Sequence, residues 1–262
     1  MAMPNTQEER LNFLIRYLLD ENKEYQDIKI PSSISEKRNL LRGLMNVRPP
    51  RTIHDDFLQI QDAYLSELLA MRGVTKLEDI NPVQPGIYLW QGDITTLAVD
   101  AIVNAANSQM LGCFVPCHGC IDNAIHTYAG VQLRLECFEI MQRQGHEEET
   151  GRAKITKAYN LPCRYVLHTV GPIIYGTVTK ADQELLASCY CSCLDLAAEY
   201  NLHSVAFCCI STGEFHFPNE LAAQIAIKTV KEWQMHSNVK VDAVFNVFKD
   251  NDYTIYKSIL QI

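Results

Sequence analysis

The sequence predicts an α/β protein with a mostly parallel sheet covered on both faces, preceded by a helical N-terminal extension. From Ile87 onward, short apolar runs alternate with longer segments of helical character, which is typical of parallel strands joined by crossover helices. Before Ile87, helix-capping patterns and helical spacing of apolar residues dominate. We therefore divide the 262 residues into an extension, residues 1–86, and an α/β domain, residues 87–262.

Three helices are predicted in the extension. Thr6-x-x-Glu9 is a capping-box pattern, and apolar residues at helical spacing follow it. We expect Ser35 to cap a second helix and a third helix to run from Asp55 to Arg72. An extension packed on the main domain is the ordinary interpretation of this region, and a separate protein-docking module is the alternative.

The α/β domain contains five predicted strands and four predicted helices. The strands are the apolar runs Ile87–Trp90, Ala101–Val103, Tyr165–Thr169, Ser204–Cys208 and Ala243–Phe248. The helices are Asp122–Arg143, Ala181–Tyr200, Asn219–His236 and a terminal one from Asp252. In sheets of this kind ligands bind at the carboxyl ends of strands, so we expect a site in the loops that follow the strands.

Composition and charge exclude several classes of function. With 47% hydrophobic and 21% charged residues, the chain can bury a sizeable core. The net charge is −8 and neither half of the chain is basic, so general nucleic-acid binding is not expected. No run approaches the roughly 18 apolar residues of a membrane helix, and the first twenty residues lack the pattern of a signal peptide. We therefore expect no membrane association and a cytoplasmic location.

Ten cysteines lie between Cys113 and Cys209, and one cluster of them predicts a metal site. Cys113, Cys117, His118 and Cys120 fall within eight residues, interleaved with glycine and proline, so they must lie on a loop. Zinc binds thiolates and imidazoles tetrahedrally, and a catalytic zinc has three protein ligands and an open position. Cys113-x4-His118-x-Cys120 can supply three corners of that tetrahedron, with Cys117 as a substitute ligand or an ordinary loop residue. Buried thiols without a metal are the alternative interpretation.

Two further loops follow predicted strands and carry polar groups. Gly92-Asp93-Ile94 follows the first strand, and an acidic residue there could accept a hydrogen bond from an exocyclic amine such as that of adenine. Ile210–Pro218 is rich in hydroxyl groups and leads into a helix, so its backbone amides and hydroxyls could hold a diphosphate. Taken singly, each of these loops is also an ordinary turn.

Taken together, these segments resemble the macrodomain family, whose members bind ADP-ribose. The resemblance covers the chain from about Ile87 to Ile262. It rests on segments that occur in the same order: Gly92–Thr95, Asn104–Ser108, Tyr165–Pro172, Ile210–Gly213, and Phe245–Phe248 with Asp252–Tyr253. It implies a three-layer α/β/α sandwich with a mixed, mostly parallel sheet.

One departure from the family pattern narrows the resemblance. Hydrolytic macrodomains carry a run of glycines before a Val-Asp-Gly-Ala-Ile-His motif, whereas this sequence has the longer segment Cys113–Cys120 before Ile121–His126. It resembles the zinc-dependent macrodomain branch, which is encoded beside a sirtuin-type ADP-ribosyltransferase and lipoate-carrier proteins in microbial genomes. The resemblance implies one Zn²⁺ per chain and a hydrolase that removes mono-ADP-ribose from a modified, acidic side chain of a carrier protein.

The resemblance also implies roles for single residues. Asn107 would hold the distal ribose, and Asp122 would act as a general base or position a water molecule. The implied metal ligands are Cys113, His118 and Cys120. The implied ADP-ribose contacts are Asp93, Ile94, Asn107, Ser211, Thr212, Gly213, Glu214, Phe215 and Phe248.

Several of these assignments have structural alternatives. Asp122 could cap a helix, and Phe248 could be a core aromatic instead of a stacking surface for adenine. His126 and His168 are expected to pack in the interior. Two other functional classes remain open: a non-catalytic ADP-ribose reader with a structural zinc, and a scaffold that acts through its N-terminal helices.

Overall fold

Three helices form the N-terminal part of the computed structural model, which describes residues 4–262. They are α1 (Gln7–Asp20), α2 (Ile34–Val47) and α3 (Asp55–Arg72), with a 3₁₀ helix, η1 (Lys23–Tyr25), after α1. The expected capping box is present, because Thr6 and Glu9 each accept a hydrogen bond from the other's backbone amide. The expected cap of α2 is wrong by two residues: the hydroxyl of Ser33, not of Ser35, accepts from the Glu36 amide at 3.2 Å.

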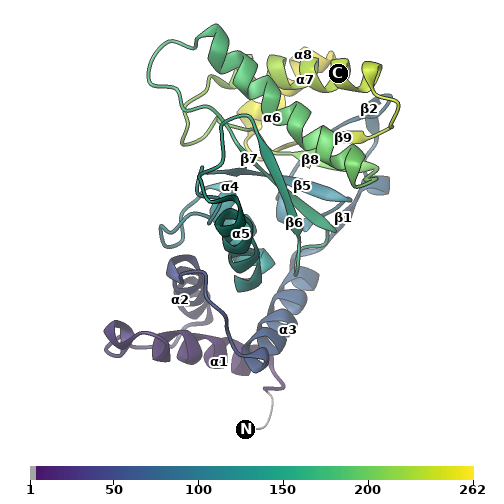
Figure 1. Cartoon of the computed structure of the whole chain (residues 1–262). Coiled ribbons are helices and arrows are strands. Elements are labelled where there is room, and N and C mark those ends of the chain that lie inside the picture. Colours follow the sequence, from purple (N-terminus) through teal and green to yellow (C-terminus); the bar gives the residue numbers. More distant parts are fainter. Residues whose placement is uncertain (1–3) are drawn as a thin grey trace.

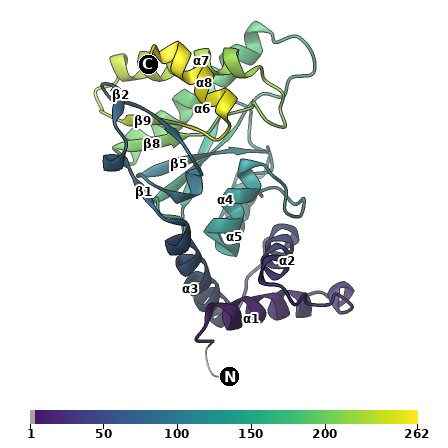
Figure 2. The same cartoon turned by 180° about the vertical axis from the view of Figure 1, so that it is seen from behind.

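The N-terminal helices build a hydrophobic core of their own. Its fully or nearly fully buried members are Leu11, Leu14, Ile15, Leu18, Leu19, Leu41, Leu44, Met45, Phe57, Ile60, Tyr64 and Leu65. Val131, from the α/β part of the chain, completes this cluster. The helices therefore pack against the α/β part, and both views show them at one end of the molecule, next to α4 (Ile121–Ala129) and α5 (Val131–Gln144) (Figures 1 and 2).

A seven-stranded mixed sheet forms the centre of the α/β part. In spatial order its strands are β2 (Pro82–Gln84), β3 (Ile87–Gln91), β9 (Asp242–Val247), β8 (Ser204–Phe207), β5 (Ala101–Ala106), β7 (Tyr165–Val170) and β6 (Ala153–Lys157). The five strands from β3 to β7 in this order are parallel, whereas the edge strands β2 and β6 pair antiparallel. The predicted mixed, mostly parallel sheet is therefore confirmed.

Four short strands are absent from the prediction. β1 (Thr75–Lys76) and β4 (Leu97–Ala98) pair only with each other, and two residues are too few to show an alternating pattern. Two 3₁₀ helices, η2 (Leu77–Asp79) and η3 (Ile94–Thr96), adjoin them. The edge strand β2 begins with a proline, and β6 has a single buried residue, Thr156, so neither forms an apolar run.

Helices cover both faces of the sheet (Figure 1). On one face are α4 (Ile121–Ala129) and α5 (Val131–Gln144), and on the other are α6 (Lys180–Glu199), α7 (Asn219–His236) and α8 (Asp250–Leu260). The hydrophobic periodicity predicts the bounds of α6 and α7 to within one residue. Within residues 4–262, no helix combines the length and the apolar character that crossing a membrane requires.

The single long helix expected over Asp122–Arg143 is wrong, because Gly130 divides it into α4 and α5. Gly130 has a φ of +98°, which residues with a side chain rarely adopt. A Cβ at this position would lie 2.6 Å from side-chain atoms of Gln132 and of Gln61 on α3. Gln61 Oε1 accepts a hydrogen bond at 3.0 Å from the amide of Val131, the first residue of α5. This break depends on a tertiary partner, which local helical spacing does not reveal.

Replacing Gly130 by alanine should destabilise the fold. A side chain in this backbone conformation costs about 1–3 kcal/mol, and it would also displace Gln61. We expect chemical denaturation to show a loss of this size for Gly130→Ala. Gly176→Ala is the control, because a Cβ at Gly176 would meet no atom within 4 Å; its effect should stay within about 0.5 kcal/mol. Equal stability of the two variants would contradict the proposed origin of the break.

Candidate functional site

The parallel strands bring several loops together at one edge of the sheet. Asp93 follows β3, Phe248 follows β9, and the loop Ile210–Pro218 lies between β8 and α7. Asn107 and the segment Cys113–Cys120, here called the metal loop, follow β5. The carboxyl ends of parallel strands lie at the same edge, so these residues follow one another in the spatial order β3, β9, β8, β5.

Three of the four candidate metal-ligating side chains converge. The ligand atoms of Cys113, His118 and Cys120 all lie within 4.8 Å of one another, and all three residues are half-buried. Cys113 Sγ lies 3.7 Å from His118 Nδ1. Tetrahedral zinc holds sulfur and nitrogen ligands about 3.6 Å apart. Burial, with the Cys113 thiol nearby, raises the pKa of Cys120 to about 12, so its thiol is protonated unless a cation is present.

The fourth candidate, Cys117, points away from this group. Its Sγ donates to the carbonyl of Asn39 on α2 at 3.3 Å, and its amide donates to Asn46 Oδ1 at 2.9 Å. Its thiol lies outside the converging group of ligand atoms. The structure therefore favours the interpretation of Cys117 as an ordinary loop residue.

His118 also faces the loop after β8. Its Nδ1 lies next to the Cys113 sulfur, whereas its Nε2 lies 3.6 Å from Glu214 Oε1. The Glu214 side chain is 68% exposed. Metal-binding histidines commonly bond a carboxylate through their second ring nitrogen, which fixes the orientation of the ring. Nδ1 is therefore the His118 atom that is available to a metal.

Asp122 belongs to a buried chain of hydrogen bonds. Its side chain is 7% exposed, and its Oδ1 accepts from Asn104 Nδ2 at 2.8 Å. The same amide nitrogen lies 3.1 Å from His168 Nδ1, and His168 Nε2 lies 2.9 Å from Thr156 Oγ1. Because Nδ1 accepts, the His168 proton is on Nε2 and points to Thr156. Burial raises the pKa of Asp122 to about 6 and lowers that of His168 to about 3.

Asp122 does not cap α4, so that alternative is wrong. The N-cap is Cys120, whose Sγ accepts from the amide of Asn123 at 3.4 Å. Asp122 lies inside the first turn, with its carboxyl group buried. A buried carboxyl group with a raised pKa at the ligand-binding edge of a sheet is a candidate for a functional role.

His126 and His168 lie in the interior, as expected. Together with Cys137 they form a second group whose ligand atoms lie within 4.8 Å of one another. Both ring nitrogens of His168 already have hydrogen-bond partners, so we interpret this group as interior packing and not as a metal site.

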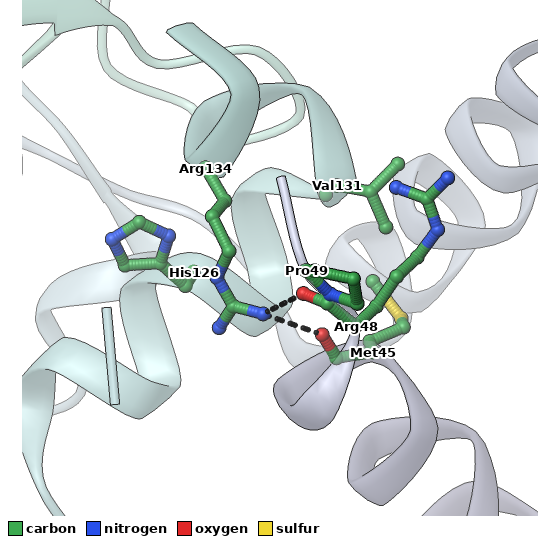
Figure 3. A pocket seen from close by; sticks show the side chains of 7 residues that line it. Met45, Arg48, Pro49, His126, Val131 and Arg134 are labelled. Atoms are coloured by element: carbon green, nitrogen blue, oxygen red, sulfur yellow. Dashed lines mark hydrogen bonds between the residues drawn. The ribbon is translucent and has the colours of Figure 1, made fainter. Parts of the chain in front are cut away.

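Beside His126 lies a cavity of about 10 Å³ between α5 and the end of α2 (Figure 3). That volume holds about one water molecule and no substrate.

Arg72, at the end of α3, holds Asp93. Its Nη2 donates to Asp93 Oδ2 and, at 2.6 Å, to Thr95 Oγ1, and its guanidinium lies 3.8 Å from the centre of the Tyr128 ring. The Asp93 side chain is still 40% exposed and can accept from a ligand. Ile94 is 1% exposed, so only its backbone could contact a ligand.

The loop after β8 contains a buried hydroxyl without a partner. Ser211 is 5% exposed, with a φ of +64°, and its Oγ has no hydrogen-bond partner among residues 4–262. A Cβ on Gly171, which follows β7, would overlap this oxygen, so Gly171 allows the close approach. Thr212, Gly213 and Phe215 continue the loop with partly or fully exposed side chains or backbone. An unsatisfied buried hydroxyl at this edge suits a polar ligand.

Phe248 and Asn107 complete the edge. Phe248 is 73% exposed, so the core alternative is wrong and its ring is free to stack. Asn107 Nδ2 donates to the carbonyl of Gly112 at 3.2 Å, and its Oδ1 accepts from the amide of Gln109 at 3.0 Å. The Asn107 side chain therefore fixes the backbone that leads into the metal loop.

The sequence analysis missed several side chains that shape this site, among them Arg72, Asn104 and Arg134. Asn104 is a fully buried amide inside a strand, and a polar residue within an apolar run is the signal that could have found it. Arg72 and Arg134 reach their partners from helices that are distant in the chain, and no local pattern marks them.

The state of His168 predicts how stability depends on pH. Its pKa of about 3 in the folded protein is below the ordinary value of 6.5. The free energy of unfolding is therefore independent of His168 above about pH 6.5, where its imidazole is neutral in both states. Below pH 6.5 the unfolded chain binds a proton that the folded protein does not, so the free energy of unfolding decreases by about 1.4 kcal/mol per pH unit. We expect His168→Gln to remove this contribution, so that the free energy of unfolding, measured by chemical denaturation, falls less steeply between pH 6 and pH 4, by about 1.4 kcal/mol per pH unit. His203→Gln, at an exposed histidine, is the control; equal slopes for all three proteins would show that His168 is not held neutral.

Comparisons with known proteins agree with this arrangement. A family model described as Macro domain matches residues 103–226. The chain is 57% identical to the "Protein-ADP-ribose hydrolase" of Treponema medium, over 97% of this chain and 99% of that protein. It is 51% identical to the protein of the same name from Staphylococcus aureus strain MSSA476, over 95% of this chain and 94% of that one.

Solved structures agree with the sequence comparisons. The Trypanosoma brucei macrodomain in complex with ADP-ribose superposes with a TM-score of 0.65 and 30% identity, over 88% of this chain and 97% of that chain. The Oceanobacillus iheyensis macrodomain with ADP gives a TM-score of 0.61 and 37% identity, over 67% of this chain and 90% of that one. The chain belongs to the macrodomain family, and it is homologous over nearly its whole length to enzymes named protein-ADP-ribose hydrolase.

Proposed function

We propose that this protein is a zinc-dependent hydrolase that removes mono-ADP-ribose from a modified, acidic side chain of another protein. One observation carries the proposal: the strand order aligns groups suited to the successive parts of ADP-ribose. Asp93 and Phe248 lie at the ends of β3 and β9, the hydroxyl-rich loop follows β8, and the metal loop follows β5. The names of the relatives, and the ADP-ribose bound to the Trypanosoma brucei macrodomain, support the same ligand.

Adenine would bind at the β3 end of this edge. Asp93 has an exposed carboxylate that can accept from the exocyclic amine, and Phe248 offers an exposed ring for stacking. The diphosphate would bind the loop after β8 through backbone amides and hydroxyl groups. That loop supplies Ser211, Thr212, Gly213, Glu214 and Phe215, while Ile94 would contribute its backbone.

The group Cys113, His118 and Cys120 fits a zinc ion with an open coordination position. Two thiolates and an imidazole are ligands that zinc prefers, and the three atoms are close enough for one ion. When bound, zinc supplies Lewis-acid chemistry, which can polarise an oxygen atom or lower the pKa of a water molecule to about 7. A structural zinc normally has four protein ligands, so a three-membered group favours a hydrolase over a non-catalytic reader.

The chain's own residues would position the reactants. Asn107 follows β5 next to the metal loop, where its carboxamide can both donate to and accept from the distal ribose. Asn104 holds Oδ1 of Asp122, which leaves Oδ2 to position or deprotonate a water molecule. In the overall reaction, water cleaves the bond between ribose and the carboxyl group, releasing ADP-ribose and the free acidic side chain.

The location and the partner are further parts of this proposal. All ten cysteines are free thiols, which suits the reducing cytoplasm. We infer that the modified partner is a carrier protein of the lipoate-carrier type, since the metal loop resembles the branch whose members are encoded beside such proteins. An assay with purified carrier, modified on an acidic side chain, tests this assignment directly.

Removing the metal ligands tests the zinc site. We expect Cys113→Ala, His118→Ala and Cys120→Ala to lose both bound zinc, measured by elemental analysis, and hydrolysis of a mono-ADP-ribosylated protein, because three ligands are the minimum for this site. A chelator should abolish wild-type activity, and added zinc should restore it. Cys117→Ser is the matched control and should keep zinc and activity. Full hydrolysis by metal-free protein would refute the zinc dependence, and binding of ADP-ribose without any release would favour a reader.

Replacing Asp122 separates catalysis from metal binding. We expect Asp122→Ala and Asp122→Asn to keep zinc, since neither change touches a metal ligand. Their hydrolysis rate should fall by about 10²–10⁴, the usual contribution of a general base. Circular dichroism serves as the control for folding. Unchanged turnover in both variants would return Asp122 to a purely structural role.

A further inference from the structure

The metal loop contains no helix or strand, so its backbone polar groups need partners from other parts of the chain. Several of these partners lie on α2, a helix to which the proposed function assigns no residue. Figures 1 and 2 both show the loop before α4 beside α2. The contacts between them involve the carbonyl of His118 and the amide and sulfur of Cys117.

Arg42 makes the most direct contact from α2 to the loop. Its Nη2 donates to the carbonyl of His118 at 2.8 Å, and its Nη2 and Nε donate to Asn123 Oδ1 at 2.7 and 3.1 Å. Asn123 is fully buried. Its side-chain Nδ2 donates to the carbonyl of Val115 at 2.9 Å, and its backbone N–H donates to Cys120 Sγ at 3.4 Å. The Arg42 guanidinium therefore orients the His118 peptide directly and the Cys120 sulfur through Asn123.

Asn46 makes a second contact from α2. This side chain is 1% exposed; its Oδ1 accepts from the Cys117 amide at 2.9 Å, and its Nδ2 donates to Thr127 Oγ1 at 2.9 Å. Cys117 has a φ of +55°, which is uncommon for a residue with a side chain. The hydrogen bond from Asn46 holds the loop in this bend, directly before His118.

Arg134 of α5 fixes the end of α2. Its Nη1 donates to the carbonyls of Met45, Asn46 and Arg48 at 3.1, 2.7 and 2.6 Å. Figure 3 shows the bonds to Met45 and Arg48. These carbonyls at the end of the helix have no partner within α2, so the guanidinium supplies the hydrogen bonds that they lack.

The same guanidinium also fixes the start of the metal loop. Arg134 Nε donates to the carbonyl of Leu111 at 2.7 Å, and its guanidinium lies 4.3 Å from the centre of the Phe114 ring. Burial lowers the pKa of Arg134 to about 10, so the group keeps its charge at neutral pH. Because one charged group binds both α2 and the loop, the loop has a fixed position relative to α2.

We propose that α2 fixes the conformation of the metal loop, and that Arg42 is a positioning residue for His118 and Cys120. This inference rests on the zinc site of the proposed function. It gives residues 1–86 a role in holding the metal, in place of a role as a separate docking module. Arg42 acts through the loop backbone and through Asn123, and it contacts neither the metal nor the substrate.

Zinc affinity of the full-length protein, measured by competition with a chelator, tests the proposal. We expect Arg42→Ala to bind zinc ten- to a hundredfold more weakly, the usual effect of removing a partner behind the metal ligands. Arg42→Lys should be intermediate, because one ammonium group replaces part of a planar fork of donors. Arg16→Ala, at an exposed arginine on α1, is the matched control and should keep wild-type affinity. At saturating zinc, Arg42→Ala should recover hydrolysis, whereas Cys120→Ala should not.

Two further readouts separate this proposal from the proposed function. Hydrogen exchange of residues 113–120 in metal-free protein should be at least tenfold faster in Arg42→Ala than in Arg16→Ala. In the cobalt-substituted protein, the absorption bands of the metal should shift in Arg42→Ala. Wild-type affinity, exchange and spectrum in a folded Arg42→Ala variant would overturn the proposal while leaving the zinc hydrolase intact. A wild-type protein that binds no zinc would refute the zinc site and the role of Arg42 toward it, and hydrogen exchange would then decide whether Arg42 orders the loop.

Discussion

Parallel pairing of the five central strands is the constraint on which the site depends. It brings the loops after β3, β9, β8 and β5 to one edge of the sheet, in that spatial order. Loops at such an edge lack hydrogen-bonding partners of their own. The metal loop meets this requirement through α2 and Arg134, and Asp93 meets it through Arg72 at the end of α3. The N-terminal helices therefore contact both ends of the candidate site.

Much of this architecture could be predicted from local sequence patterns. Apolar runs gave the central strands, and helical spacing gave α1, α3, α6 and α7, because these elements bury one face or stripe against the core. The close spacing of Cys113, His118 and Cys120 likewise pointed to a loop whose ligand atoms converge. In each case the information lies within about twenty consecutive residues.

What could not be predicted depends on contacts between distant segments. The break at Gly130 is stabilised by Gln61 of α3. The cap of α2 is the exception, because Ser33 accepts from the amide of Glu36 three residues later, which is a local contact. Arg72 and Arg134 are ordinary helical residues until the fold brings a carboxylate or a set of carbonyls to them. Burial of Asp122 beside Asn104 also depends on how α4 docks on β5, which no periodicity specifies.

The contacts of Arg134 affect the order in which the chain can mature on the ribosome. The polypeptide is made from its N-terminus, and its early segments begin to fold while later ones are still being synthesised. The carbonyls at the end of α2 emerge 86 to 89 residues before the arginine that binds them. During that interval these carbonyls can accept hydrogen bonds from water but not from Arg134. The first third of the polypeptide therefore reaches its mature packing only after most of the second third has left the exit tunnel.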